Sequence, residues 1–99
     1  MQALDESGGT VIAATDAEIL TAWRMISTVE GIFVEPASAA GIAGLKLQID
    51  QGKLDPRGRR VVAVVTGHGL KDPEIVLKGA PDPMLIEPSL ESLERYLSL

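Results

Sequence analysis

Uninterrupted apolar runs and apolar positions at helical spacing divide the chain into a few predicted elements. The clearest uninterrupted run is Val61–Val65, five apolar residues of which four are valine. Such a run predicts a strand buried on both faces, as in a parallel sheet that is covered by helices. A shorter run, Thr10–Ala14, predicts a second strand. Met1–Gly9, with polar side chains and two glycines, is expected to form a loop.

The first predicted helix follows a threonine and a glutamate that stand three residues apart, Thr15 and Glu18. This spacing is that of a capping box, in which each side chain bonds to the backbone N–H of the other residue. Apolar positions then recur at roughly helical spacing, at Ile19, Leu20, Trp23, Ile26 and Val29. We predict a helix over Asp16–Glu30 that ends at Gly31.

A second helix is predicted over Ala37–Gln51, because Pro36 occupies a favoured first-turn position and Gly52 ends the pattern. Its first turns hold small side chains, which would let another backbone or a flat ligand approach closely. A last helix is predicted over Leu90–Leu97, with Ser89 as its N-cap. The remaining segments are expected to be an extended connection at Gly31–Glu35, a turn at Lys53–Arg59, a short helical turn at Glu74–Lys78 and an irregular, proline-containing stretch at Gly79–Pro88.

The predicted order is strand, helix, helix, strand, loop and helix, which indicates an α/β fold. Ninety-nine residues allow one domain at most. We therefore expect a single domain over residues 1–99, with a partial parallel sheet flanked by helices. Two strands are marginal for an independent sheet. The pattern is therefore typical of a piece of a larger fold.

Composition narrows the classes of function. The formal net charge of −5 disfavours a nucleic-acid or anionic-membrane surface. The absence of cysteine excludes disulfides and thiolate chemistry, and a single histidine excludes a histidine-rich metal site. No apolar run approaches the roughly 20 residues of a membrane span, and no secretory leader is visible. We expect no metal, nucleic-acid or membrane partner, and a cytoplasmic location.

Residues that could carry chemistry follow the valine run. Thr66 ends the predicted strand, at the edge where open α/β sheets place ligands. Its neutral hydroxyl could hydrogen-bond a ring nitrogen without protonating it, or satisfy a nearby carbonyl. His68 could carry a proton near neutral pH or be an ordinary loop residue, and Asp72 is expected to pair with Lys71 or cap the following turn. Glu35 could interact with the dipole of the second helix or line a pocket.

Three motifs stand in order along the chain. They are DESGG followed by ATD at positions 5–9 and 14–16, EGIFVEPASAA at 30–40, and TGHGLKDP at 66–73. Taken together, these motifs resemble the carboxyl-terminal part of the threonine synthase family. That family is similar to tryptophan synthase β, serine/threonine dehydratase and cystathionine β-synthase, which are fold-type-II enzymes that use pyridoxal phosphate.

The resemblance implies the end of the large cofactor-binding domain of an enzyme that converts O-phospho-L-homoserine and water to L-threonine and phosphate. It also implies that Thr66 hydrogen-bonds the pyridine nitrogen of pyridoxal phosphate, and that Glu35 and Ser38 line the cofactor side of the pocket. Family members carry an upstream Schiff-base lysine motif and a phosphate-binding loop, and these 99 residues contain neither. By this resemblance the chain is a fragment of a lyase that is inactive alone, and no catalytic residue is assigned within it.

Two other hypotheses remain open. An incomplete sheet would expose strand edges and apolar helix faces, which favours a non-catalytic interaction module that associates with itself as a homo-oligomer. The third hypothesis is a small regulatory domain that binds an anion at the Gly67–Gly69 loop.

Overall fold

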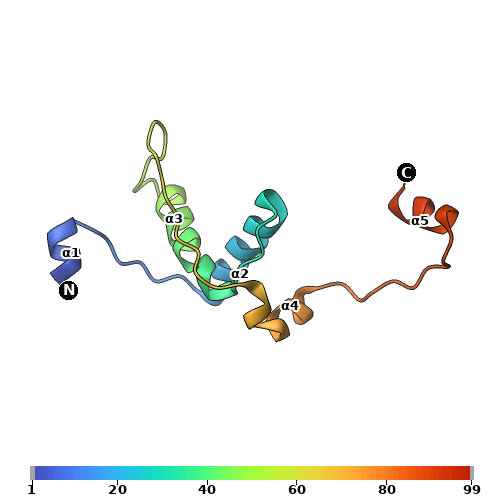
Figure 1. Cartoon of the computed structure of the whole chain (residues 1–99). Coiled ribbons are helices and arrows are strands. Elements are labelled where there is room, and N and C mark those ends of the chain that lie inside the picture. Colours follow the sequence, from blue (N-terminus) through green and yellow to red (C-terminus); the bar gives the residue numbers. More distant parts are fainter. Residues whose placement is uncertain (1, 99) are drawn as a thin grey trace.

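The computed structural model describes residues 2–98 (Figure 1). Within this range the chain is mainly helical, and its longest helices are α2 and α3. The helical elements, in chain order, are α1 (Gln2–Ser7), α2 (Asp16–Met25), the π-helical turn η1 (Ile26–Glu30), the 3-10 turn η2 (Pro36–Ala39), α3 (Ala40–Asp50), the 3-10 turn η3 (Gly69–Lys71), α4 (Pro73–Gly79) and α5 (Leu90–Leu97).

The molecule is elongated, with principal extents of 61 × 30 × 19 Å. Its centre is formed by α2, η2 and α3, which pack against one another. The helices α1 and α5 lie at opposite ends, and extended segments join α1 to α2 and α5 to α4 (Figure 1). No helix in the described part of the chain is long and apolar enough to cross a membrane.

The predicted parallel sheet is wrong. Among residues 2–98 the only β pairing is an isolated antiparallel bridge between Val34 and His68. Residues 61–65 are extended but unpaired, and the side chains of Val62 and Val64 are 81% and 77% exposed. A strand buried on both faces needs strands beside it and helices over it, and the described chain supplies no partner strands because most of its other apolar residues lie in helices.

Two further predictions near the N-terminus are also wrong. Residues 10–14 are extended without a partner strand, so the second predicted strand is absent. The expected N-terminal loop contains the helix α1, in which the Gln2 amide donates to the Glu6 carboxylate one turn later, at 2.8 Å. Side-chain hydrogen bonds between residues four positions apart stabilise short exposed helices. The residue types of this segment did not by themselves indicate a helix.

The predicted capping box is confirmed. The Thr15 backbone N–H and hydroxyl donate to the Glu18 carboxylate at 2.7 and 2.8 Å, and the Glu18 N–H donates back to the Thr15 hydroxyl at 3.3 Å. The helix continues through η1 and stops at Gly31, whose φ of 67° lies in the left-handed region that glycine adopts most easily. The helix therefore spans the predicted range, although its last turn is π-helical.

The other helix signals are confirmed as well. Pro36 opens η2, which leads directly into α3, and Gly52 beyond α3 has a φ of 65°. The Asp72 carboxylate accepts a hydrogen bond from the Ile75 N–H at the start of α4. The Ser89 hydroxyl accepts one from the Ser92 N–H at the start of α5. Each of these helix starts is determined by a side chain next to it in the sequence.

The small core lies where α2 faces η2 and α3. It contains Ala22, Trp23, Ile26, Val34, Ala39 and Ala43. The indole N–H of Trp23 donates to the backbone carbonyl of Val34 at 2.6 Å, inside this core. Ala39 is fully buried, so the small side chains of this region allow α2 to approach η2 and α3 closely.

The capping box makes the stability of α2 depend on pH. Hydrogen bonds from the Thr15 backbone N–H and then from its hydroxyl hold the pKa of Glu18 below its ordinary value of 4.5. The stabilisation is therefore complete above that value and is lost as the pH falls through the lowered pKa. We expect Glu18→Gln to remove this part of the pH dependence of helix unfolding between about pH 7 and pH 3, measured by circular dichroism. Parallel curves for the two proteins would contradict the expectation.

The bond from Trp23 to Val34 gives a second prediction. Trp23→Phe keeps an aromatic ring in the core but leaves the buried Val34 carbonyl without its donor. We expect the free energy of unfolding to fall by about 1–3 kcal/mol in denaturant titrations. Tyr96→Phe is the control, since Tyr96 is 53% exposed on α5. A loss no larger than that of the control would show that the bond contributes little.

Candidate functional site

Two segments far apart in the sequence meet beside the core. The first runs from Phe33 into η2, and the second is the glycine-containing loop before η3. The Glu35 N–H donates to the Gly67 carbonyl at 2.9 Å, and the Gly69 N–H donates to the Phe33 carbonyl at 3.3 Å. These two bonds flank the Val34–His68 bridge and fix the loop against the segment.

The Ser38 hydroxyl organises the centre of this site. Its oxygen accepts hydrogen bonds from the Gly67 N–H at 2.8 Å and from the Thr66 N–H at 3.2 Å. It also lies 3.2 Å from the Thr66 hydroxyl oxygen. A hydroxyl has two lone pairs and one proton, so the Ser38 oxygen, having accepted twice, donates its proton to Thr66. The proton of the exposed Thr66 hydroxyl is then free to be donated to a ligand.

Glu35 packs directly on the loop. A Cβ atom added to the buried Gly67 would lie 2.7 Å from the Cβ of Glu35 and would collide with its carboxylate. The same is true of the buried Gly69, whose added Cβ would collide with the Phe33 ring. Both glycines are therefore required for close approach, and the carboxylate of Glu35 lies beside the loop that holds Thr66.

His68 has a local structural role in this geometry. Its Nδ1 accepts a hydrogen bond from the Leu70 N–H at 3.2 Å, which caps η3 and leaves the proton of the neutral ring on Nε2. Its ring meets the Phe33 ring edge-on, with centroids 5.7 Å apart and an angle of 85° between the planes. The backbone N–H groups of Thr66, Gly67 and Gly69 are likewise all used within the protein. The loop therefore gives the anion-binding hypothesis no support.

A pocket of about 330 Å³ adjoins Glu35. It is lined by Asp16, Ile19, Leu20, Glu35, Pro36, Ala37, Asp72 and Ile75. Three of these residues carry carboxylates and none is cationic, so this pocket repels a phosphate group. An anionic group would therefore have no cationic partner among the residues that line this pocket.

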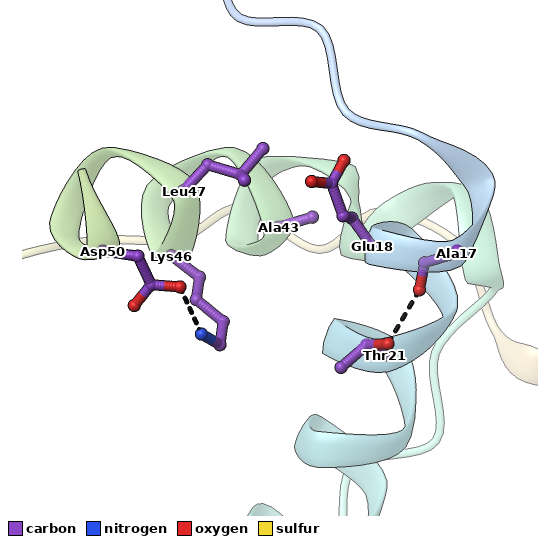
Figure 2. A pocket seen from close by; sticks show the side chains of 7 residues that line it. All are labelled: Ala17, Glu18, Thr21, Ala43, Lys46, Leu47 and Asp50. Atoms are coloured by element: carbon purple, nitrogen blue, oxygen red, sulfur yellow. Dashed lines mark hydrogen bonds and ion pairs between the residues drawn. The ribbon is translucent and has the colours of Figure 1, made fainter.

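A second pocket, of about 260 Å³, lies between α2 and α3 (Figure 2). Its polar side chains already have partners within the protein. Lys46 forms an ion pair with Asp50, the Thr21 hydroxyl donates to the Ala17 carbonyl at 2.7 Å, and Glu18 belongs to the capping box. What remains is a small apolar surface formed by alanines and Leu47, so this pocket offers no groups for chemistry.

The structure brings together the three site residues expected from the sequence. Thr66, Ser38 and Glu35 lie around Gly67, although Ser38 and Thr66 are 28 positions apart. Sequence reasoning missed the contribution of Phe33, which packs on Gly69 and His68. The sequence did hold a signal for a role of Phe33 in the site. Phe33 is the only phenylalanine of a chain with few aromatic residues, and it lies within the motif at positions 30–40.

Comparison with known proteins identifies relatives of the chain. Residues 1–67 match the family described as pyridoxal-phosphate dependent enzyme. The chain is 45% identical over 97 residues to the threonine synthase of Methanocaldococcus jannaschii. The aligned residues make up 98% of this chain and 24% of that protein. The chain is 50% identical over 90 residues to the threonine synthase of Mycobacterium bovis, with 89% and 25% covered. The threonine synthase of Synechocystis is 47% identical over 94 residues, with 93% and 24% covered.

The chain thus spans about a quarter of the length of the curated relatives it matches. The matched family region, residues 1–67, includes Glu35, Ser38, Thr66 and Gly67. The candidate site therefore lies within the part of the chain that the family shares.

The Ser38 hydroxyl gives a testable prediction. Ser38→Ala removes the acceptor of the buried Gly67 N–H, so the loop should open more often. We expect hydrogen exchange of the Gly67 amide to accelerate by about tenfold or more, measured by NMR. Ser7→Ala is a matched control, since Ser7 accepts only an exposed bond from the Gly9 N–H. Unchanged exchange at Gly67 would show that Ser38 does not hold the loop.

Proposed function

The chain belongs to the family of pyridoxal-phosphate dependent enzymes, and from this we propose that it is the C-terminal portion of a threonine synthase. The complete enzyme would convert O-phospho-L-homoserine and water to L-threonine and phosphate, as a lyase of fold type II acting in the cytoplasm. The similarity to threonine synthases from archaea and bacteria supports this assignment.

One observation carries the proposal. The Ser38 hydroxyl accepts two backbone N–H groups and donates to Thr66, which leaves the Thr66 hydroxyl as an exposed donor. A neutral donor of this kind suits an unprotonated ring nitrogen, because a hydroxyl does not transfer its proton as a carboxylic acid can. We therefore assign Thr66 to the pyridine nitrogen of pyridoxal phosphate, with Ser38 as the residue that positions it.

Bound pyridoxal phosphate supplies an electron-withdrawing ring that stabilises negative charge developing on an amino-acid substrate. Thr66 would orient that ring and leave its nitrogen neutral. Glu35 would contribute to the wall beside the ring, since it packs against the loop that carries Thr66. The rigid contact between Gly67 and Glu35 would hold this wall at a fixed distance from the hydroxyl.

We further propose that the 99 residues are inactive alone. The pocket next to Glu35 is acidic and apolar, so the phosphate of the cofactor and that of the substrate would have to be held by other groups. The side chain of Lys46 is engaged with Asp50 in the pocket between α2 and α3 rather than beside Thr66. The chain would then supply one wall of a site that a further polypeptide segment completes.

Complementation tests this function. The purified chain would be mixed with the Methanocaldococcus jannaschii threonine synthase from which the matching quarter has been deleted, and phosphate release from O-phospho-L-homoserine would be followed. We expect the mixture to be active, and Thr66→Ala to lower the rate by about tenfold or more because one hydrogen bond to the cofactor is lost. Thr66→Ser keeps the hydroxyl and should retain most of the rate.

Two results would contradict the proposal. Equal rates for Thr66→Ala and the parent chain would remove Thr66 from the cofactor site. Phosphate release by the 99-residue chain alone, or its saturable covalent labelling by pyridoxal phosphate in an absorbance titration, would show that the chain already contains a working attachment lysine.

A further inference from the structure

The loop that carries Thr66 is held by a side chain that the proposed function does not use. His68 Nδ1 accepts a hydrogen bond from the Leu70 N–H at 3.2 Å, and this bond caps the start of η3. The backbone of His68 also forms the bridge with Val34. His68 therefore belongs both to the pairing that fixes the loop and to the turn that follows it.

The turn at η3 and the pairing of the loop share the same backbone groups. Gly69 is the first residue of η3, and its N–H donates to the Phe33 carbonyl at 3.3 Å. The His68 carbonyl accepts the Lys71 N–H at 3.0 Å within the turn. The conformation of η3 thus sets where the Gly69 N–H points. The Nδ1 bond of His68 acts on this turn, only two residues after Thr66.

The bond to the Leu70 N–H requires a lone pair on Nδ1. A neutral imidazole has one nitrogen that accepts and one that donates, whereas both nitrogens of an imidazolium donate. Only the neutral ring with its proton on Nε2 can therefore make this bond. An asparagine side chain can likewise accept from the N–H two residues later, whereas a phenylalanine ring has no acceptor. The acceptor of His68 can thus be separated from its ring by substitution.

We propose that His68 is a positioning residue for the Thr66 hydroxyl and that it acts through the lone pair of Nδ1. The neutral ring holds the Leu70 N–H, which fixes η3 and keeps the loop closed with Thr66 beside Ser38. Loss of the lone pair, by substitution or by protonation of the ring, opens the loop more often. What Thr66 binds rests on the proposed function, whereas closure of the loop does not.

The elements around His68 carry three other charged groups. They are Glu35 on the paired segment, Lys71 in η3, and Asp72, whose carboxylate accepts the Ile75 N–H. Carboxylates ordinarily titrate below about pH 5 and lysines above about pH 9, and imidazole titrates between them. A change in loop closure between about pH 7.5 and 5.5 that disappears when His68 is replaced is therefore due to its ring.

Two substitutions separate the acceptor from the ring, and a third is the control. His68→Phe keeps an aromatic ring next to Phe33 but has no acceptor for the Leu70 N–H. His68→Asn supplies an acceptor at the same position without the ring. Lys71→Ala changes a side chain of the same turn and leaves Nδ1 in place.

Hydrogen exchange of the Gly67 and Gly69 amides is followed by NMR in the 99-residue chain, with the buried Ile26 as reference. We expect exchange at both glycines to be about three- to tenfold faster in His68→Phe, and His68→Asn and Lys71→Ala to stay close to the parent. In the parent, protection of Gly69 relative to Ile26 should fall as the pH is lowered from about 7.5 to 5.5. His68→Asn should show no such fall.

Three results would overturn the role of the lone pair. They are unchanged exchange in His68→Phe, equal acceleration in His68→Phe and His68→Asn, and protection of Gly69 in the parent that does not change with pH. If His68→Phe accelerates Ile26 as much as the glycines, the whole chain is destabilised, and the pH dependence of the parent then decides by itself.

The link to the cofactor is tested in the active mixture used for the proposed function. His68→Phe should raise the pyridoxal phosphate concentration for half-maximal rate by about threefold or more, and His68→Asn should leave it unchanged. A rise for Thr66→Ala without one for His68→Phe would overturn the positioning role. If neither variant changes this concentration, the assignment of Thr66 to the cofactor fails, and the exchange of Gly67 and Gly69 still decides whether His68 closes the loop.

Discussion

The hydrogen bond between the Trp23 indole and the Val34 carbonyl connects the stable part of the molecule to its candidate site. Trp23 lies on α2 and is held in the core, and Val34 is the residue through which the neighbouring segment pairs with His68. On either side of Val34, Phe33 and Glu35 bond to the loop and leave room only for its glycines. The position of the Thr66 hydroxyl therefore depends on one indole in the core. The chain contains no second tryptophan that could supply this bond.

Local signals in the sequence predicted local structure well. The Thr15–Glu18 pair, Gly31, Pro36 and Ser89 each act on backbone groups within a few residues, and the helices begin or end where these residues indicate. The valine run failed as a predictor because burial on two faces is a property of the surroundings. Five apolar residues in a row favour burial of the segment, but the described chain holds no neighbouring strands that could bury it.

The sequence named residues for the candidate site, and the structure alone shows how they lie relative to one another. Motif resemblance named Glu35, Ser38 and Thr66, and the structure places them around one glycine. The direction of the hydrogen bonds could not be predicted, because it follows from two backbone N–H groups reaching the same serine oxygen from a loop 28 or 29 positions away. Likewise, the packing of Phe33 on Gly69 depends on the long-range bridge, which no pattern in either segment specifies alone.

The Val34–His68 bridge also links closure of the loop to binding of a ligand. It joins residues 34 positions apart, and closing a flexible loop of that length costs about 3 kcal/mol of chain entropy before any contact is made. The contacts between α2 and η2 join residues that are closer together in the sequence, so forming them costs less chain entropy. A ligand that binds only the closed form of the loop that carries Thr66 would shift the equilibrium towards that form, so affinity at Thr66 and the closure equilibrium of the loop are thermodynamically linked.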